Sequence, residues 1–204
     1  MASSLKGYIP ALARHLGISP AALYERQRAL VRAGLLDMSE GRGPGSGVLA
    51  DSHAIGLLLT AVLATGSLTD TEARVRAIAG AQPVGDQARN FLGSITLATT
   101  FLEILEESMS YKQQANLVNE ITVSRTAAAA EIIFRDNDGE LIVISFAGPD
   151  ANEPELRVAA TLAREPFQEI AADAQAIFTE NREESRQAAE RKRELAERER
   201  ERTP

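Results

Sequence analysis

The sequence of 204 residues contains no cysteine, two histidines and three lysines. The absence of cysteine excludes disulfides and thiolate metal sites, and it is compatible with a reducing, intracellular location. The two histidines alone make a poor transition-metal site, so we expect neither a metal nor another cofactor. The three lysines lie outside the strands that the sequence predicts, which argues against a Ser-Lys self-cleaving dyad. So few histidines cannot supply a nucleophile, its base and an orienting carboxylate, and we expect no enzymatic activity.

Long hydrophobic runs are also missing. The most apolar run, Ala54 to Ala64, is shorter than the roughly 20 residues that cross a bilayer, and it is typical of a buried helix. The first residues lack the apolar stretch and the small-residue cleavage site of a secretory signal. These absences predict a cytoplasmic protein without a membrane partner.

Charge is distributed unevenly along the chain. The formal net charge is −7, but residues 1–50 carry six basic and three acidic side chains, a local charge of +3. The other residues carry 16 basic and 26 acidic side chains, a charge of −10. A basic head on an acidic body suits a protein whose head contacts phosphate.

The spacing of apolar residues predicts several helices and a small sheet. Helical spacing occurs over residues 52–65, 70–78, 87–109 and 166–180. Alternation of apolar and polar residues predicts strands over residues 121–123, 128–134, 142–146 and 156–162, arranged as an antiparallel meander. The turn at residues 136–139 has the residue types that close a hairpin, and it lacks the downstream glutamate of a calcium loop.

Residues 9–36 contain a helix-turn-helix pattern. Ala13 is small, which lets two helices cross closely, and Gly17 permits the left-handed conformation that ends the first helix. Ser19 is expected to cap the second helix, with Pro20 at its first position. The second helix then runs to about residue 33 and turns two leucines inward.

This head resembles the DNA-binding domain of bacterial and phage winged helix-turn-helix transcription regulators. The resemblance covers about a quarter of the chain and rests on Ala13, Leu16, Gly17, Ile18, Ser19, Leu23, Leu30, Gly34 and Leu35. In that family the second helix is the recognition helix and lies in the major groove. One position departs from the family pattern, because Gln27 stands where an aliphatic residue is usual.

The resemblance implies a set of DNA-binding residues. Ser19 would contact phosphate and Arg14 would lie near the DNA backbone. The residues that would face the bases are Ala21, Tyr24, Glu25 and Arg28. Arg28 is the best single candidate, because a guanidinium can bond a guanine edge through two hydrogen bonds. His15 is expected on the helix surface near phosphate, and His53 near the start of a later helix.

The segment after the second helix resembles the wing of that family. Residues 33–36 lead into a first wing strand, residues 41–47 form a glycine-rich tip, and residues 48–50 return. Such a tip lays backbone amides and an arginine along the minor groove, which implies that Arg42 and Gly43 contact DNA. A nucleotide site is improbable there, because no Lys-Ser or Lys-Thr follows the glycines and they do not join a strand to a helix.

The expected fold class is α+β, with four regions. Residues 1–50 form a winged helix-turn-helix DNA-binding domain, and residues 51–112 a helical linker and oligomerisation region. Residues 113–180 form the antiparallel sheet flanked by a long C-terminal helix. Residues 181–204 are a charged tail that is either helical or disordered, because it has too little apolar surface to repay the entropy of ordering.

The sequence as a whole predicts a transcription regulator that binds an inverted repeat of double-stranded DNA. Its Ala- and Arg-rich composition would also suit a regulator from a phage or mobile element. A homodimer is expected because the apolar faces of the 87–109 and 166–180 helices exceed what a few strands can cover. Repressor and activator are both open, as is a small-molecule or protein effector. Two other classes share the pattern: a DNA-packaging or replication protein, and a protein-binding inhibitor module without salt-dependent affinity for DNA.

Overall fold

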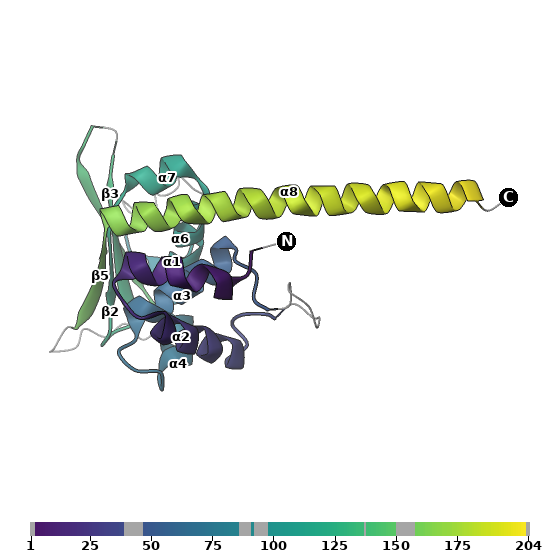
Figure 1. Cartoon of the computed structure of the whole chain (residues 1–204). Helices are drawn as coiled ribbons and strands as arrows, with labels where there is room; N and C mark the ends of the chain where they lie inside the picture. The colour runs from purple at the N-terminus through teal and green to yellow at the C-terminus, as the bar shows by residue number, and fades with distance from the viewer. Residues whose placement is uncertain are drawn as a thin grey trace.

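The computed structural model describes residues 3–38, 47–85, 91, 98–136, 138–149 and 158–202, with the side chains of Lys192 and of residues 194–202 left out. The shorter helices lie on one face of an antiparallel sheet, and a long C-terminal helix runs along them and projects beyond them (Figure 1). This confirms the mixed helix and sheet class, the antiparallel sheet and the long C-terminal helix. Within the described ranges, no helix has the length and apolar character needed to cross a membrane.

Most helices precede most strands along the chain, and the longest helix follows the last strand. The helices are α1 (Leu5–Leu16), α2 (Pro20–Arg32), α3 (Ser52–Ala64), α4 (Thr71–Ala79), α6 (Phe101–Ser110), α7 (Lys112–Leu117) and α8 (Arg164–Arg202). The strands are β1 (Gln82–Pro83), β2 (Val118–Ser124), β3 (Ala129–Arg135), β4 (Leu141–Ala147) and β5 (Ala159–Ala163). Most of the sheet therefore comes from the second half of the chain, as the alternating pattern predicted.

The sheet has the strand order β1-β4-β3-β2-β5, and all neighbouring strands are antiparallel. β2, β3 and β4 form the expected meander. The fourth predicted strand does not continue it, because β5 pairs with β2 and not with β4. Alternate residues such as Ile132 and Phe134 are buried on the face that the helices cover. The edge strand β1 was not expected, because two residues are too few to show an alternation.

The hairpin between β3 and β4 has the predicted chemistry. Gly139 has φ of 88°, a conformation that favours glycine. The Asp136 carboxylate accepts hydrogen bonds from the backbone N–H groups of Asp138 and Glu140, both at 2.9 Å. The carboxylate thus holds its own turn, which is the role of aspartate in a hairpin.

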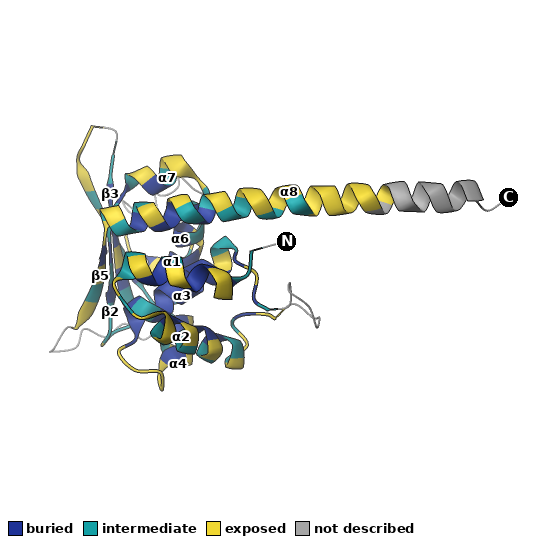
Figure 2. Cartoon of the chain, in the orientation of Figure 1, coloured by how far each residue is buried: buried dark blue, intermediate teal, exposed yellow. Residues whose placement is uncertain are grey.

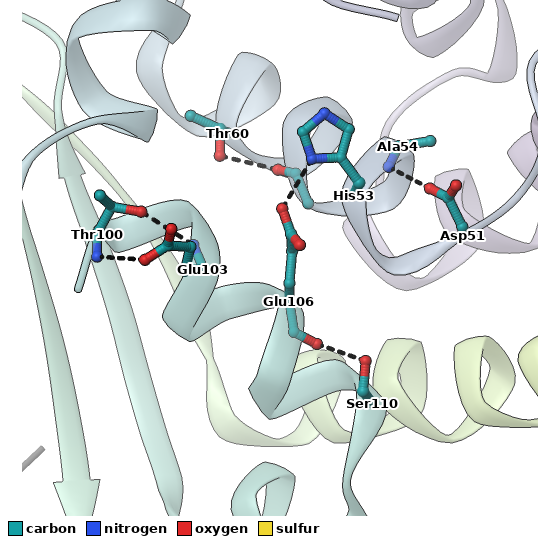
Figure 3. A network of polar contacts seen from close by, with 9 residues as sticks. Asp51, His53, Ala54, Thr60, Thr100, Glu103, Glu106 and Ser110 are labelled. Atoms are coloured by element: carbon teal, nitrogen blue, oxygen red, sulfur yellow. Dashed lines mark hydrogen bonds and ion pairs between the residues drawn. The ribbon is translucent and has the colours of Figure 1, made fainter. Parts of the chain in front are cut away.

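α3 is the central helix of the fold. Residues Ala54 to Ala61 are all buried between α2, α4, α6 and the sheet, which confirms the buried helix that the apolar run predicted. The Asp51 carboxylate caps the helix by accepting the N–H of Ala54 at 2.8 Å (Figure 3). His53, in the first turn as expected, lies 2.8 Å from the Glu106 carboxylate of α6 (Figure 3).

Three arginines surround the C-terminal end of α3. Its last carbonyls accept hydrogen bonds from guanidinium groups: Val62 and Leu63 from Arg125, Ala64 from Arg74, and Thr65 from Arg26. These carbonyls have no partner within the helix and carry the negative end of its dipole, so cations stabilise them. Burial lowers the pKa of Arg26, and the nearby Arg125 lowers it further. The three guanidinium groups therefore have a structural role.

The prediction of one continuous helix over residues 87–109 is wrong, because the chain leaves the helical conformation near the middle of this range. Residues 98–100 are not helical, and α6 begins at Phe101. Thr100 and Glu103 form a capping box: the threonine hydroxyl accepts the N–H of Glu103 at 3.3 Å, and the carboxylate accepts the N–H of Thr100 at 3.1 Å (Figure 3). Hydrogen bonds from Thr99 and Thr100 hold the pKa of Glu103 below its usual value. A new helix that begins in phase with the apolar spacing explains why spacing alone missed the break.

α1 lies antiparallel to the first half of α8. The Tyr8 hydroxyl donates to the carbonyl of Ile170 at 3.3 Å, and burial followed by the nearby Asp173 raises the pKa of this tyrosine. The two ring nitrogens of His15 lie 2.8 Å from the carboxylates of Glu169 and Asp173. The expectation that His15 lies on the surface near phosphate is wrong, because its side chain is only 12% exposed and is flanked by carboxylates that repel phosphate.

Hydrogen bonds also join both ends of the head, residues 3 and 50, to Asn181 of α8. The Ser3 N–H donates to Asn181 Oδ1 at 2.7 Å, and Asn181 Nδ2 donates to the carbonyl of Ala50 at 3.2 Å. The buried apolar side chains form one cluster that extends from Leu5 of the head to Ala174 of α8. α1, α2 and the body therefore share a single core.

Candidate nucleic-acid interface

The turn between α1 and α2 has the geometry that its sequence predicts. Gly17 has φ of 63°, and the N–H groups of Gly17 and Ile18 donate to the carbonyls of Arg14 and Ala13. The Ser19 hydroxyl accepts the N–H of Ala22 at 3.2 Å, and Pro20 is the first residue of α2. The glycine corner and the serine cap thus set the direction in which α2 leaves the turn.

α2 presents one face to the core and another to solvent. Leu23 and Leu30 are fully buried against the rest of the protein, as predicted. The exposed residues recur at helical spacing along the opposite face: Ala21, Tyr24, Arg28 and Arg32. The outer face of α2 is therefore accessible along the whole helix.

A basic hollow lies beside the C-terminal half of this exposed face. Its volume is about 400 Å³, and it is lined by Ser4, Lys6, Tyr24, Gln27, Arg28, Val31, Arg32, Met38, Gly47 and Val48. Three of these residues are cations and none is acidic. The Lys6 ammonium lies 5.7 Å from the centre of the Tyr24 ring, in the range of a cation–π contact. The N-terminus of α1, the face of α2 and residues 47–48 together form this surface.

Arg28 has one acidic neighbour outside the lining of the hollow. Its guanidinium lies 3.1 Å from the Glu25 carboxylate, and the two side chains are 58% and 44% exposed. An exposed ion pair three residues apart on a helix contributes little to stability. Arg28 can therefore exchange this partner for another acceptor at small cost.

The structure brings only some of the predicted site residues together. Tyr24 and Arg28 line the basic hollow, and Glu25 is bonded to Arg28. Arg14, Ser19 and Ala21, all exposed, do not line it. The Ser19 hydroxyl is already bonded within the cap. Arg42 and Gly43 lie outside the described residues.

Most of the lining residues were not among the predicted site residues, and these include the two cations Lys6 and Arg32 and the exposed Met38. Lys6 and Arg32 contribute to the positive charge of residues 1–50, which was the only sequence signal for them. Their position in one hollow depends on how the start of α1 packs against the end of α2, and motif spacing does not report that packing.

The described part of the expected wing differs from the prediction. Residues 33–38 form turns and bends, with no strand among them. The returning segment pairs instead with the start of the chain: Leu49 bridges Ser4, the N–H of Leu5 donates to Val48, and the N–H of Ala50 donates to Ser3. Residues 39–46, the tip between these segments, lie outside the described residues.

Gln27, the residue that departs from the helix-turn-helix pattern, is buried in α2. The residue is only 7% exposed, and its buried Oε1 has no hydrogen-bond partner in the described structure. Gln27→Leu should raise the free energy of unfolding by about 1 kcal/mol, because it removes an unpaired buried amide and adds apolar contact. Urea unfolding measures the change.

The control for this substitution is Gln187→Leu on the exposed part of α8, which should change the unfolding free energy by less than about 0.5 kcal/mol. A Gln27→Leu variant that is less stable than the original chain would show that the amide makes an interaction on which the head depends.

Comparison with protein families, with curated proteins and with solved structures finds no match for this chain.

Proposed function

We propose that this chain is a sequence-specific DNA-binding regulator of transcription, in which α1 and α2 form a helix-turn-helix of the winged type and α2 is the recognition helix. The observation that carries the proposal is the exposed face of α2, which ends in a basic hollow containing Lys6, Arg28 and Arg32 and no acidic lining residue. A convex helix face beside a cationic concave surface fits a base edge next to a phosphate backbone.

Each part of this surface has a proposed role. Tyr24 and Arg28 read bases, since they lie on the solvent face of α2, and Arg28 gives up its exposed pair with Glu25 for a guanine edge. Lys6 and Arg32 contact phosphate at the rim of the hollow. Arg42 and Gly43 of the wing tip contact the adjacent minor groove.

The proposed regulator acts as a homodimer. Two recognition helices about 34 Å apart would read the two halves of an inverted repeat. A ring of higher order would instead favour a packaging or replication protein with the same head, and the mass of the assembly separates these two proposals.

One observation favours a protein partner over DNA. The hollow is also lined by Val31, Met38 and Val48, and Met38 is 61% exposed. Apolar lining residues of this kind suit a protein-binding inhibitor module. Such a module would not bind duplex DNA in a salt-dependent way.

Selection from a random pool of DNA duplexes tests the sequence-specific proposal. The original chain should enrich one motif, and Arg28→Ala should lose the preference at one guanine position while keeping its fold and part of its affinity, because only one base contact is removed. Sequencing of the bound fragments measures both outcomes.

Arg193→Ala is the matched control, because Arg193 is an exposed arginine on α8, far from the hollow. It should leave the selected motif unchanged. Enrichment of no motif by the original chain, or the same motif from Arg28→Ala, would contradict the assignment of Arg28 as a base-reading residue.

A further inference from the structure

The two edges of the sheet differ in how they are protected from another chain. At one edge, β1 is two residues long and contains Pro83, which has no N–H to donate. A short edge strand with a proline is a usual means of preventing pairing with a further strand. At the other edge, β5 is five residues long, has no proline or charged residue, and keeps a regular register with β2. The β5 edge therefore lacks this protection.

The side of β5 that faces away from β2 offers backbone groups to a partner. The Arg125 N–H donates to the carbonyl of Val158 at 2.6 Å, just before β5 begins. Backbone groups point alternately to the two sides of a strand, so those of Ala159, Thr161 and Ala163 point away from β2. These three residues are exposed, and exposed stretches of β5 are visible in Figure 2. Among the described residues, no other strand pairs with this side of β5.

We infer that the β5 strands of two copies of this chain pair antiparallel about a two-fold axis at Thr161, which joins the two sheets into one. In this register Thr161 lies opposite Thr161 of the second copy, and Ala159 lies opposite its Ala163. The outward backbone groups of all three residues then find hydrogen-bond partners. The side chains that meet are small and uncharged, so no like charges oppose the pairing. The strand is thus complementary to a second copy of itself.

Both faces of the sheet continue across this interface. On the face away from the helices, the Thr161 hydroxyl lies 3.0 Å from the Thr122 hydroxyl of β2. Pairing of the two copies extends this contact to a row of four threonines, and threonine pairs across strands stabilise a sheet. On the other face Leu162 is buried and Ala160 is half-buried under the helices. A second copy covers the open end of this core.

The symmetry of the pairing favours a second copy over a strand from another protein. The two-fold axis of an antiparallel edge pair is perpendicular to the sheet, so both copies present the same face to the same side. The described helices of one copy all lie on one side of the sheet (Figure 1). Both heads therefore lie on that side of the joined sheet, as the reading of an inverted repeat requires.

This inference rests on the proposed function for the role of the dimer, and it deepens that function by naming the interface. The pairing itself does not depend on DNA, and the two are tested by different measurements. A monomer that binds a single half-site would overturn the inference and leave the DNA-binding proposal intact. A dimer that binds no DNA would do the reverse.

Disulfide trapping in the full chain tests the register, and the absence of native cysteine makes single replacements unambiguous. Thr161→Cys should form a covalent dimer on mild oxidation, because the paired Cα atoms lie about 5.5 Å apart, a distance that a disulfide spans. Ala159→Cys should stay monomeric in a denaturing gel, since its two copies are offset by roughly 13 Å along the strands. Ala159→Cys combined with Ala163→Cys should form the dimer again.

Val143→Cys is the control, because Val143 is exposed on β4 and lies away from the β5 edge. It should not cross-link. Cross-linking of Ala159→Cys alone would indicate a parallel pair or another register and would overturn the inference. Failure of Thr161→Cys to cross-link would overturn it as well.

Sedimentation equilibrium tests the same pairing without a covalent bond. The chain of 21.9 kDa should have twice that mass at about 100 µM. Thr161→Lys and Thr161→Glu should each weaken dimerisation at least about 30-fold, because each places like charges opposite one another at the axis. An equal mixture of these two variants should regain the dimer, since opposite charges then face each other. Thr161→Val, which adds no charge, should dimerise within about threefold of the original chain.

Three results would overturn the inference: a monomeric original chain, a Thr161→Lys variant that dimerises as well as the original, or a mixture of the two charged variants that stays monomeric. A monomeric chain would leave the edge to a strand from another protein. Thermal melting checks that the variants keep the fold, which is expected because Thr161 is exposed and its backbone groups point away from β2.

Discussion

Replacing Arg74 with alanine should lower the free energy of unfolding by about 3 kcal/mol, which is a large effect for one residue of α4. The guanidinium donates to the carbonyls of Ala64 at 2.9 Å, Ser124 at 2.7 Å and Ala127 at 3.0 Å. It thereby joins the end of α3 to the turn between β2 and β3. The variant leaves these part-buried carbonyls without their charged donor. Urea unfolding followed by circular dichroism measures the loss.

Two further substitutions show whether the loss of stability comes from the three hydrogen bonds that the guanidinium donates. Arg74→Lys should recover little stability, because a single ammonium cannot reach all three carbonyls. Arg193→Ala, on the exposed part of α8, should change the unfolding free energy by less than about 0.5 kcal/mol. A loss below about 1 kcal/mol for Arg74→Ala would contradict the structural role of the three arginines around α3.

Neutralising two cations of the basic hollow should weaken binding to duplex DNA roughly 30-fold at physiological salt. The variant is Lys6→Gln with Arg32→Gln, and both residues line the hollow and are exposed. Because their proposed contacts are to phosphate, the loss should be similar for every DNA sequence. Fluorescence anisotropy of a labelled duplex measures the affinity.

The matched control changes the net charge by the same amount elsewhere. Arg186→Gln with Arg193→Gln removes two exposed arginines of α8 and should weaken binding no more than about twofold. Equal losses from the two double variants would mean that overall charge, rather than the basic hollow, attracts the DNA.

Much of the fold could be predicted where local chemistry determines the structure. The apolar run around Leu58 gave a buried helix, because no face of it could be left in water. Alternation in β3 and β4, with Gly139 at the turn, gave the hairpin. Gly17 and Ser19 gave the turn before α2, because a left-handed glycine and a hydroxyl cap are the local means of ending one helix and starting the next.

The features that could not be predicted depend on contacts between distant segments or on signals weaker than the apolar period. The capping box at Thr100 starts a helix in phase with the preceding spacing, so the period concealed the break. His15 has its partners more than 150 residues away on α8. Lys6 joins the hollow only because the start of α1 packs near Tyr24, which a search of the second helix for base-reading residues does not consider.

The central claim is that the face of α2 and the basic hollow beside it bind duplex DNA. Its most direct test is the affinity of the unmodified chain for a labelled duplex, measured across a range of salt concentrations. The two phosphate-directed cations of each copy, Lys6 and Arg32, predict that the logarithm of the dissociation constant rises with the logarithm of salt with a slope of about 2 for each bound copy. Binding that is absent, or that does not change with salt, would contradict the claim.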